Sequence, residues 1–136
     1  MAIEVAKAAH EGGQIDYTVG DVRTWKPLQP ADLVVISYLH MPIDELVEVI
    51  TTAGTWLRPD GHLLYLGHSL ENSMFGVGGP ADRTVLPDLA DLARAARGLR
   101  VLELAHLVNR RGAQRSIDVL LHAVLWGVHP HRAFAG

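Results

Sequence analysis

Two histidines stand at the ends of apolar segments and are the first side chains in the sequence with catalytic potential. His40 closes the stretch "ADLVVISYLH" and His68 closes the stretch "GHLLYLGH". An imidazole has an ordinary pKa of about 6.5, so its neutral form can take up a proton at physiological pH. We therefore consider both as candidate catalytic bases. The alternative is that each only fills space at the rim of the fold.

The same two histidines could instead be two ligands of a metal ion. Zinc sites combine imidazoles with further ligands such as carboxylates or thiolates. Glu71 is the nearest carboxylate after His68, and it lies in an irregular stretch of the sequence. The chain contains no cysteine. We therefore predict no metal site.

The segments around the histidines predict a strand, a helix and a second strand. The run Asp32–Tyr38 is apolar after its first residue, which is typical of a strand covered on both faces of a parallel sheet. Pro42 marks a helix start, and apolar residues then recur at helical spacing up to Ala53. The stretch "RPDG" at 58–61 predicts a turn before a strand at 62–66. Such short connections predict a right-handed βαβ unit with parallel, neighbouring strands.

The rest of the chain predicts an α/β domain with helices on both faces of a mostly parallel sheet. The polar link "NRRGAQR" between the last two apolar segments is too short for a crossover helix, so these segments should form an antiparallel hairpin. The remaining predicted elements are helices at Ile3–Glu11 and Pro87–Arg97, strands at Ile15–Val19, Leu99–Val108 and Ile117–Trp126, an irregular loop at Ser69–Thr84 and a tail from Gly127 to Gly136.

The carboxyl ends of parallel strands share one edge of a sheet, and ligands of open α/β sheets bind beyond that edge. We therefore expect a ligand-binding rim at this edge. Asp21 has a second interpretation, as a loop aspartate that caps a turn with its own side chain. The residues expected at the rim are Gly20 and Asp21 after the first strand, Ser37, Tyr38, Leu39 and His40 after the second, and Gly67, His68 and Ser69 after the third.

The order of these elements resembles the class I S-adenosylmethionine-dependent methyltransferases, whose Rossmann-like sheet closes with an antiparallel hairpin. Three stretches carry the resemblance together with the hairpin: "YTVGDV" at Tyr17–Val22, "ADLVVISYLH" at Ala31–His40 and "WLRPDGHLLYLGH" at Trp56–His68. The third is similar to the family's turn L-[RK]-P-G-G-x-L, with Asp60 in place of the first glycine. The resemblance is closest to small bacterial methyltransferases of the tellurite-resistance-like and thiopurine-methyltransferase-like kind.

The resemblance implies a transferase that moves a methyl group from S-adenosylmethionine to a small molecule. The acidic residue after a strand resembles the family's residue that binds the adenine amino group, and His40 and His68 would border the acceptor as catalytic residues. The residues for which the resemblance implies cofactor contact are Asp21, Val22, Ser37, Tyr38 and Leu39.

The sequence departs from the family pattern at its beginning. The glycine-rich motif E/D-x-G-x-G-x-G and the acidic residue that holds the ribose hydroxyls do not occur in it. In the family's strand order, 3-2-1-4-5-7-6, strands 1 and 2 would be missing, and part of the cofactor would have no wall. We interpret residues 1–126 as a partial methyltransferase-like domain and 127–136 as a tail. We expect an N-terminally truncated form; a second chain that supplies the missing part and a sheet that closes without it are the alternatives.

The composition of the chain limits the kinds of partner that it is expected to bind. The 136 residues carry a formal net charge of -3, which gives no general attraction to nucleic acid or anionic membranes. No apolar run reaches the roughly 20 residues of a membrane span, and the charges at Glu4, Lys7 and Glu11 are not those of a signal peptide. We expect a cytoplasmic protein with a small-molecule substrate and without nucleic-acid or membrane partners, and leave open whether it is a homo-oligomer.

Two other functions compete with methyl transfer. One is a non-catalytic α/β module that binds a partner, or self-associates, through an open edge of the sheet. The other is a different nucleotide-binding enzyme, such as a dehydrogenase. The antiparallel hairpin argues against a dehydrogenase, and no G-x-G-x-x-G motif occurs in the sequence.

Overall fold

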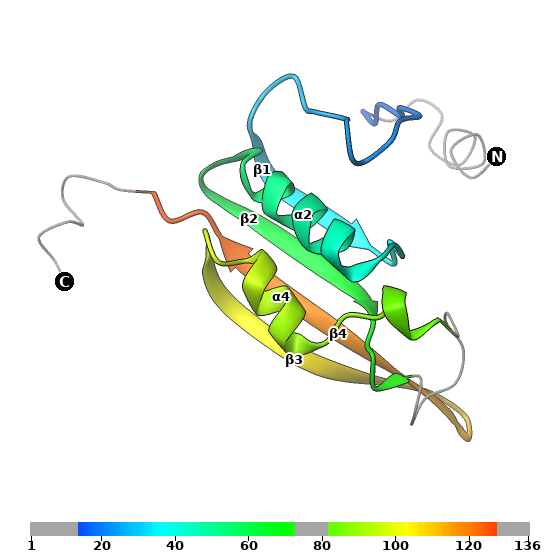
Figure 1. Ribbon diagram of the computed structural model, residues 1–136. Coiled ribbons are helices and arrows are strands. Elements are labelled where there is room, and N and C mark those ends of the chain that lie inside the picture. The colour runs from blue at the N-terminus through cyan, green and yellow to red at the C-terminus, as the bar shows by residue number, and fades with distance from the viewer. Residues whose placement is uncertain (1–13, 73–81, 128–136) are drawn as a thin grey trace, which may run out of the picture.

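The computed structural model describes residues 14–72 and 82–127. These residues contain a mixed four-stranded sheet with two α-helices on one of its faces (Figure 1). The strands lie in the spatial order β1-β2-β4-β3, with β1 parallel to β2 and the other neighbours antiparallel. The elements are β1 (Ala31–Ser37), α2 (Ile43–Gly54), β2 (Leu57–His68), the 3-10 helix η1 (Arg83–Val85), α4 (Leu89–Ala95), β3 (Arg100–Arg111) and β4 (Gln114–Val124).

The predicted βαβ unit is confirmed. The parallel pairing of β1 and β2 aligns Val34 with Leu63 and Ile36 with Tyr65. Helix α2 begins directly after Pro42, which occupies the N-cap position. Its apolar residues recur at helical spacing, so one side of the helix is buried against the sheet.

The turn predicted at 58–61 is wrong, because these residues belong to β2. In the β1–β2 ladder Ala31 is opposite Leu57, whereas Leu33 is opposite His62. The additional residues of β2 between Leu57 and His62 therefore bulge out of the ladder. Asp60 has a φ of 66°, a left-handed conformation that aspartate tolerates better than most residues. Its Oδ1 accepts a hydrogen bond of 3.2 Å from the backbone N–H of Gly127. A bulge held by a side chain therefore replaces the turn.

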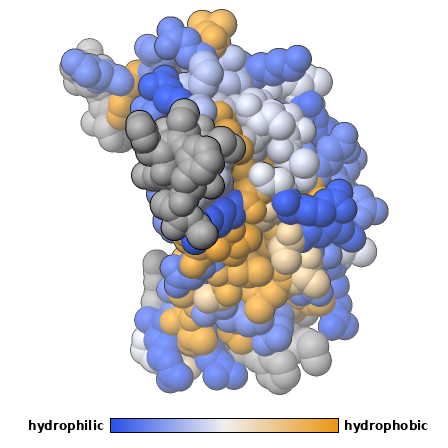
Figure 2. Space-filling model, turned by 90° about the vertical axis from the view of Figure 1, so that its left-hand side faces the viewer, coloured by the Kyte–Doolittle hydropathy of each residue, from blue (hydrophilic) through white to orange (hydrophobic). Residues whose placement is uncertain are grey.

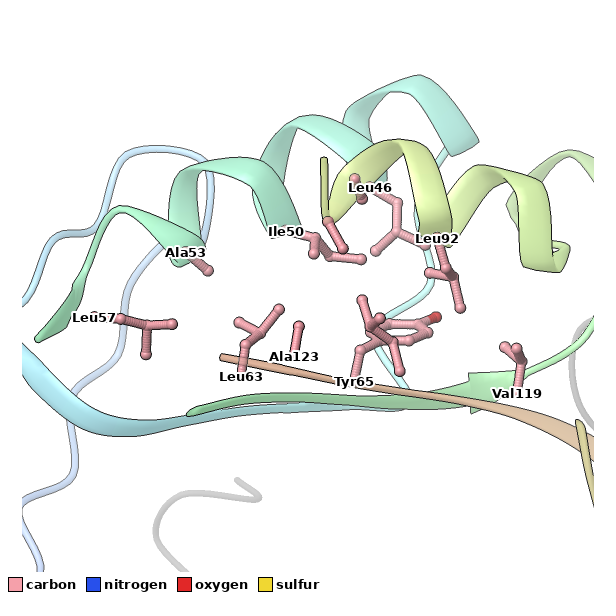
Figure 3. Close-up of a cluster of buried hydrophobic side chains, with 12 residues drawn as sticks. Leu46, Ile50, Ala53, Leu57, Leu63, Tyr65, Leu92, Val119 and Ala123 are labelled. Carbon is pink, nitrogen blue, oxygen red and sulfur yellow. The ribbon is translucent and has the colours of Figure 1, made fainter. Parts of the chain in front are cut away.

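The hydrophobic core lies between the sheet and the two helices (Figure 3). Leu63 and Tyr65 of β2 point from the sheet toward the helices, and both are fully buried. Ile50 of α2 and Leu92 of α4 meet them from above (Figure 3). Burying one such aliphatic side chain contributes about 1.5–3 kcal/mol, so this layer fixes the position of β2 and its carboxyl end.

Both α-helices among the described residues cover the same face of the sheet, and the helix predicted at Ile3–Glu11 lies outside the described residues. On the opposite face, Leu33 and Val35 of β1 are 53% and 58% exposed. Figure 2, in which the left-hand side of Figure 1 faces the viewer, shows a broad hydrophobic area that is bordered by hydrophilic side chains. The apolar run of β1 therefore has one covered face and one face that is largely open.

The first predicted strand is also wrong. Residues 15–19 belong to an extended coil, and Val19 is 84% exposed. The alternation of polar and apolar residues suits a strand, but no neighbouring strand pairs with it among the described residues. The helix predicted at Ile3–Glu11 lies outside the described residues, as does most of the tail.

The C-terminal hairpin is confirmed and is longer than predicted. In the ladder between β3 and β4, the pairs run from Arg100 opposite Val124 to Arg111 opposite Gln114. Gly112 closes the turn with a φ of 62°, a conformation that favours glycine. The hairpin lies next to β2 through β4, so its tip extends beyond the carboxyl ends of the parallel strands (Figure 1).

Candidate functional site

The two candidate histidines meet at the carboxyl edge of the parallel strands. The rings of His40 and His68 stack with an interplanar angle of 10° and a centroid distance of 5.6 Å. The ring of Tyr38 lies 5.2 Å from the ring of His68. The parallel pairing of β1 and β2 brings these residues together, as the sequence predicted.

A buried carboxylate that the sequence analysis did not identify lies behind this cluster. Asp118 is only 1% exposed. Its Oδ2 accepts hydrogen bonds from the Tyr38 hydroxyl at 2.8 Å and from Nδ2 of Asn109 at 2.6 Å. Its Oδ1 lies 3.0 Å from Nδ1 of His68, at ion-pair distance. Asp118 thus links β4 to residues from β3, β2 and the end of β1.

The antiparallel direction of β4 explains why Asp118 reaches the site. Its partner in the β2–β4 ladder is His68, the last residue of β2. The one local signal is an aspartate inside the apolar run "SIDVLLHAV", which is an unusual place for a charged residue.

Tyr38 ends β1 in a strained conformation. Its φ is 53°, which a bulky side chain rarely adopts and which costs about 1–3 kcal/mol. The hydrogen bond to Asp118 raises the pKa of the Tyr38 hydroxyl, and burial and the carboxylate charge raise it further. The hydroxyl therefore remains a donor at physiological pH, and its bond to Asp118 offsets part of the strain.

Two effects keep the ring of His40 neutral. Burial lowers its pKa, and a positive charge on the neighbouring His68, whenever that ring is protonated, lowers it further. Because the ordinary value is about 6.5, a lowered pKa leaves this imidazole unprotonated at pH 7. His40 is consequently in the form that can accept a proton.

A groove of about 450 Å³ lies in front of His40. Asp21, Val22 and Leu39 line it, so the structure brings three of the five predicted cofactor residues to one candidate base. Glu45 at the start of α2 adds a second carboxylate to the wall. This groove is the place where a ligand could meet His40.

Asp21 caps a turn, which was its alternative interpretation. Its Oδ1 accepts hydrogen bonds from the backbone N–H of Arg23 at 2.9 Å and from Nε of the same residue at 3.2 Å. These bonds lower the pKa of Asp21, so the carboxylate is ionised near neutral pH. Turn capping and ligand binding are compatible, because Oδ2 has its own lone pairs.

The other two predicted cofactor residues lie elsewhere. Ser37 lines a second hollow of about 630 Å³, which it shares with Leu39, Val22 and Trp25 along β1. The Trp25 ring packs edge-on against the Trp56 ring, with the ring centroids 5.2 Å apart. Tyr38 lines neither hollow and instead holds Asp118.

The described residues contain no cluster of three or more side chains suited to bind a metal ion. A further histidine pair, His62 and His122, lies within the sheet, with Nδ1 and Nε2 2.8 Å apart. His106 is opposite Val119 in the β3–β4 ladder, so it does not face His122. Within residues 14–72 and 82–127, no helix is both long and apolar enough to cross a membrane.

Several solved structures share this fold, whereas no protein-family model and no curated protein matches the chain. The N-methyltransferase NodS from Bradyrhizobium japonicum WM9 is 15% identical, with a TM-score of 0.71 over 92% of this chain and 68% of the NodS chain. NodS in complex with S-adenosyl-L-homocysteine gives a TM-score of 0.70, at 15% identity, over 91% of this chain and 61% of its own. TehB from Haemophilus influenzae is 12% identical, with a TM-score of 0.65 over 89% of this chain and 44% of TehB.

These similarities confirm the predicted fold class. The described chain has the α/β, Rossmann-like fold of the class I S-adenosylmethionine-dependent methyltransferases. The strand order β1-β2-β4-β3 corresponds to strands 4-5-7-6 of the family order, with the hairpin at its end. At 10–16% identity the similarity defines the fold, and the residues of the site must carry any argument about activity.

Proposed function

We propose that the protein takes part in the S-adenosylmethionine-dependent methylation of a small molecule in the cytoplasm. One observation carries the proposal: the groove beyond the carboxyl edge of this fold holds Asp21, Val22 and Leu39 next to the neutral imidazole of His40. Ligands of open α/β sheets bind at this edge.

The groove residues fit the adenine half of the cofactor. The carboxylate of Asp21 can accept a hydrogen bond from an adenine amino group, and Val22 and Leu39 offer apolar surfaces to the ring. When bound, the cofactor supplies an electrophilic methyl group on a sulfonium. The sequence contains no glycine-rich motif for the methionine half, so we assign that half to no residue of this chain.

The roles proposed for the chain's own residues follow from their positions. His40 lines the groove as a neutral base and takes a proton from the acceptor. His68 stacks against it and keeps its ring in place. The described residues thus supply an adenine platform and a base, which are two of the parts that alignment of acceptor and methyl group needs.

Calorimetric titration with S-adenosyl-L-homocysteine tests the proposal. The wild type should bind, and Asp21→Asn should bind about tenfold more weakly, because an amide presents a donor to the adenine amino group yet keeps an oxygen for the turn. Asp44→Asn, at a 99% exposed side chain outside the groove, is the matched control and should bind like the wild type. A folded wild type that does not bind would refute the proposal.

A second function is supported by the open edge of the sheet. Among the described residues β1 pairs only with β2, and the 630 Å³ hollow runs along it beside the exposed Leu33 and Val35. An extended segment of a partner or of a second copy could add a strand there. Sedimentation should then show self-association that Val35→Lys abolishes; a wild type that is monomeric at all concentrations would exclude self-association through this edge.

A further inference from the structure

The contact between His68 and Asp118 determines where a proton must lie. Nδ1 of His68 and Oδ1 of Asp118 are 3.0 Å apart, and both atoms are buried without another hydrogen-bond partner among the described residues. Two bare acceptor atoms at this distance would repel each other. A proton on Nδ1 removes the repulsion and gives each buried atom the partner that it needs.

The second carboxylate oxygen fixes the orientation of Asp118. Oδ2 accepts from two donors, the Tyr38 hydroxyl and the Asn109 amide. Among the described residues, the groups that contact His68 are Asp118 of β4 and, after the end of β1, Tyr38 and His40. Asn109 of β3 is uncharged, so within the described part of the chain Asp118 is the one acidic group in this contact network.

We propose that Asp118 is a positioning residue that holds the proton of His68 on Nδ1 and leaves Nε2 as its proton-accepting nitrogen. This inference rests on the proposed function for the step that it serves. In that step the X–H bond of the acceptor breaks, its electron pair stays on X, and the proton bonds to a ring nitrogen of His40, whose ring stacks on that of His68. Such a base suits acceptors that must lose a proton, namely hydroxyls and amines.

The structure predicts what Asp118→Asn does to this proton. The position of Oδ2 faces two donors, so the amide oxygen must occupy it. The amide NH₂ then occupies the position of Oδ1 and donates to Nδ1 of His68. Since Nδ1 can accept only when it carries no proton, the neutral ring must move its proton to Nε2.

Long-range ¹⁵N–¹H NMR of the histidine rings tests the inference, with His68 assigned from the signals that disappear in His68→Gln. In the wild type at neutral pH, Nδ1 of His68 should resonate as a protonated ring nitrogen; in Asp118→Asn it should resonate as an unprotonated one. Tyr38→Phe removes a donor to Oδ2 but keeps Oδ1, so it should leave the proton on Nδ1. Asp44→Asn should change nothing.

Two results would overturn the inference. One is a wild-type His68 with a bare Nδ1, and the other is an Asp118→Asn variant that is folded and keeps the proton on Nδ1. If Asp118→Asn does not fold, the wild-type and Tyr38→Phe spectra still decide. The measurement needs no cofactor, so its failure is distinct from a failure to bind S-adenosyl-L-homocysteine.

Discussion

Replacement of Tyr65 by phenylalanine should raise the free energy of unfolding, although the same change destabilises most proteins. Tyr65 is fully buried, and its hydroxyl has no hydrogen-bond partner among the described residues. Burial raises the pKa of this hydroxyl, and the charge of Asp118 raises it further. The hydroxyl is therefore desolvated without compensation, which costs about 1–3 kcal/mol.

The magnitude follows from two opposing contributions. Tyr65→Phe removes the desolvation cost and leaves a void of about 10–15 Å³, the size of one oxygen-sized probe, which costs about 0.3 kcal/mol at about 24 cal/mol per Å³. The net gain is about 1–2 kcal/mol, or about 3–10 °C in Tm for a chain of this size.

Urea denaturation and thermal unfolding followed by circular dichroism measure this gain. Tyr38→Phe is the matched control, because it removes a hydroxyl that does donate to Asp118, and it should lower the free energy of unfolding by about 1–2 kcal/mol. If Tyr65→Phe is less stable than the wild type, the Tyr65 hydroxyl has a bonding partner in solution and the reasoning fails.

Three further predictions concern the supports of the site. Gly67→Ala should cost about 2 kcal/mol or more in urea denaturation, because its Cβ would overlap the Tyr65 hydroxyl; unchanged stability would show that this ring can move aside. Asp88→Ala removes the capping box of α4 and should cost about 0.5–2 kcal/mol in the same assay, whereas no loss would mean that the cap is dispensable. The lowered pKa of His40 implies a contribution to stability that is present above pH ~6.5 and lost as pH falls through the lowered value. Unfolding measured between about pH 8 and about pH 5 should therefore lose this part of its pH dependence in His40→Gln; identical profiles would contradict the shift.

The sequence predicted those elements whose causes are local. The run of β1, the spacing in α2 and the short link of the hairpin each follow from a few neighbouring residues, and all three are confirmed. The edge at which His40 and His68 meet followed from the parallel pairing alone. The prediction that Ile15–Val19 is a strand failed because a strand also requires a partner, which local alternation does not reveal.

Asp118 shows what local patterns leave out. Its place in the site depends on the register of the β2–β4 ladder, which sets it opposite His68. A residue near the beginning of an antiparallel strand reaches the carboxyl edge of its parallel neighbours, so the rule that site residues follow strands misses it. The bulge at Asp60 similarly depends on pairing with β1.

The β2–β4 ladder also determines when the site can form during folding. The βαβ unit from Ala31 to His68 and the hairpin from Arg100 to Val124 are each built from contacts between segments close in the chain. The pairing of His62–His68 with 118–124 joins them into one sheet, and closing so long a loop has a large entropic cost. Because His68 and Asp118 are the last pair of this ladder, neither half contains their contact by itself. Completion of the native topology and formation of the His68–Asp118 contact are therefore one event.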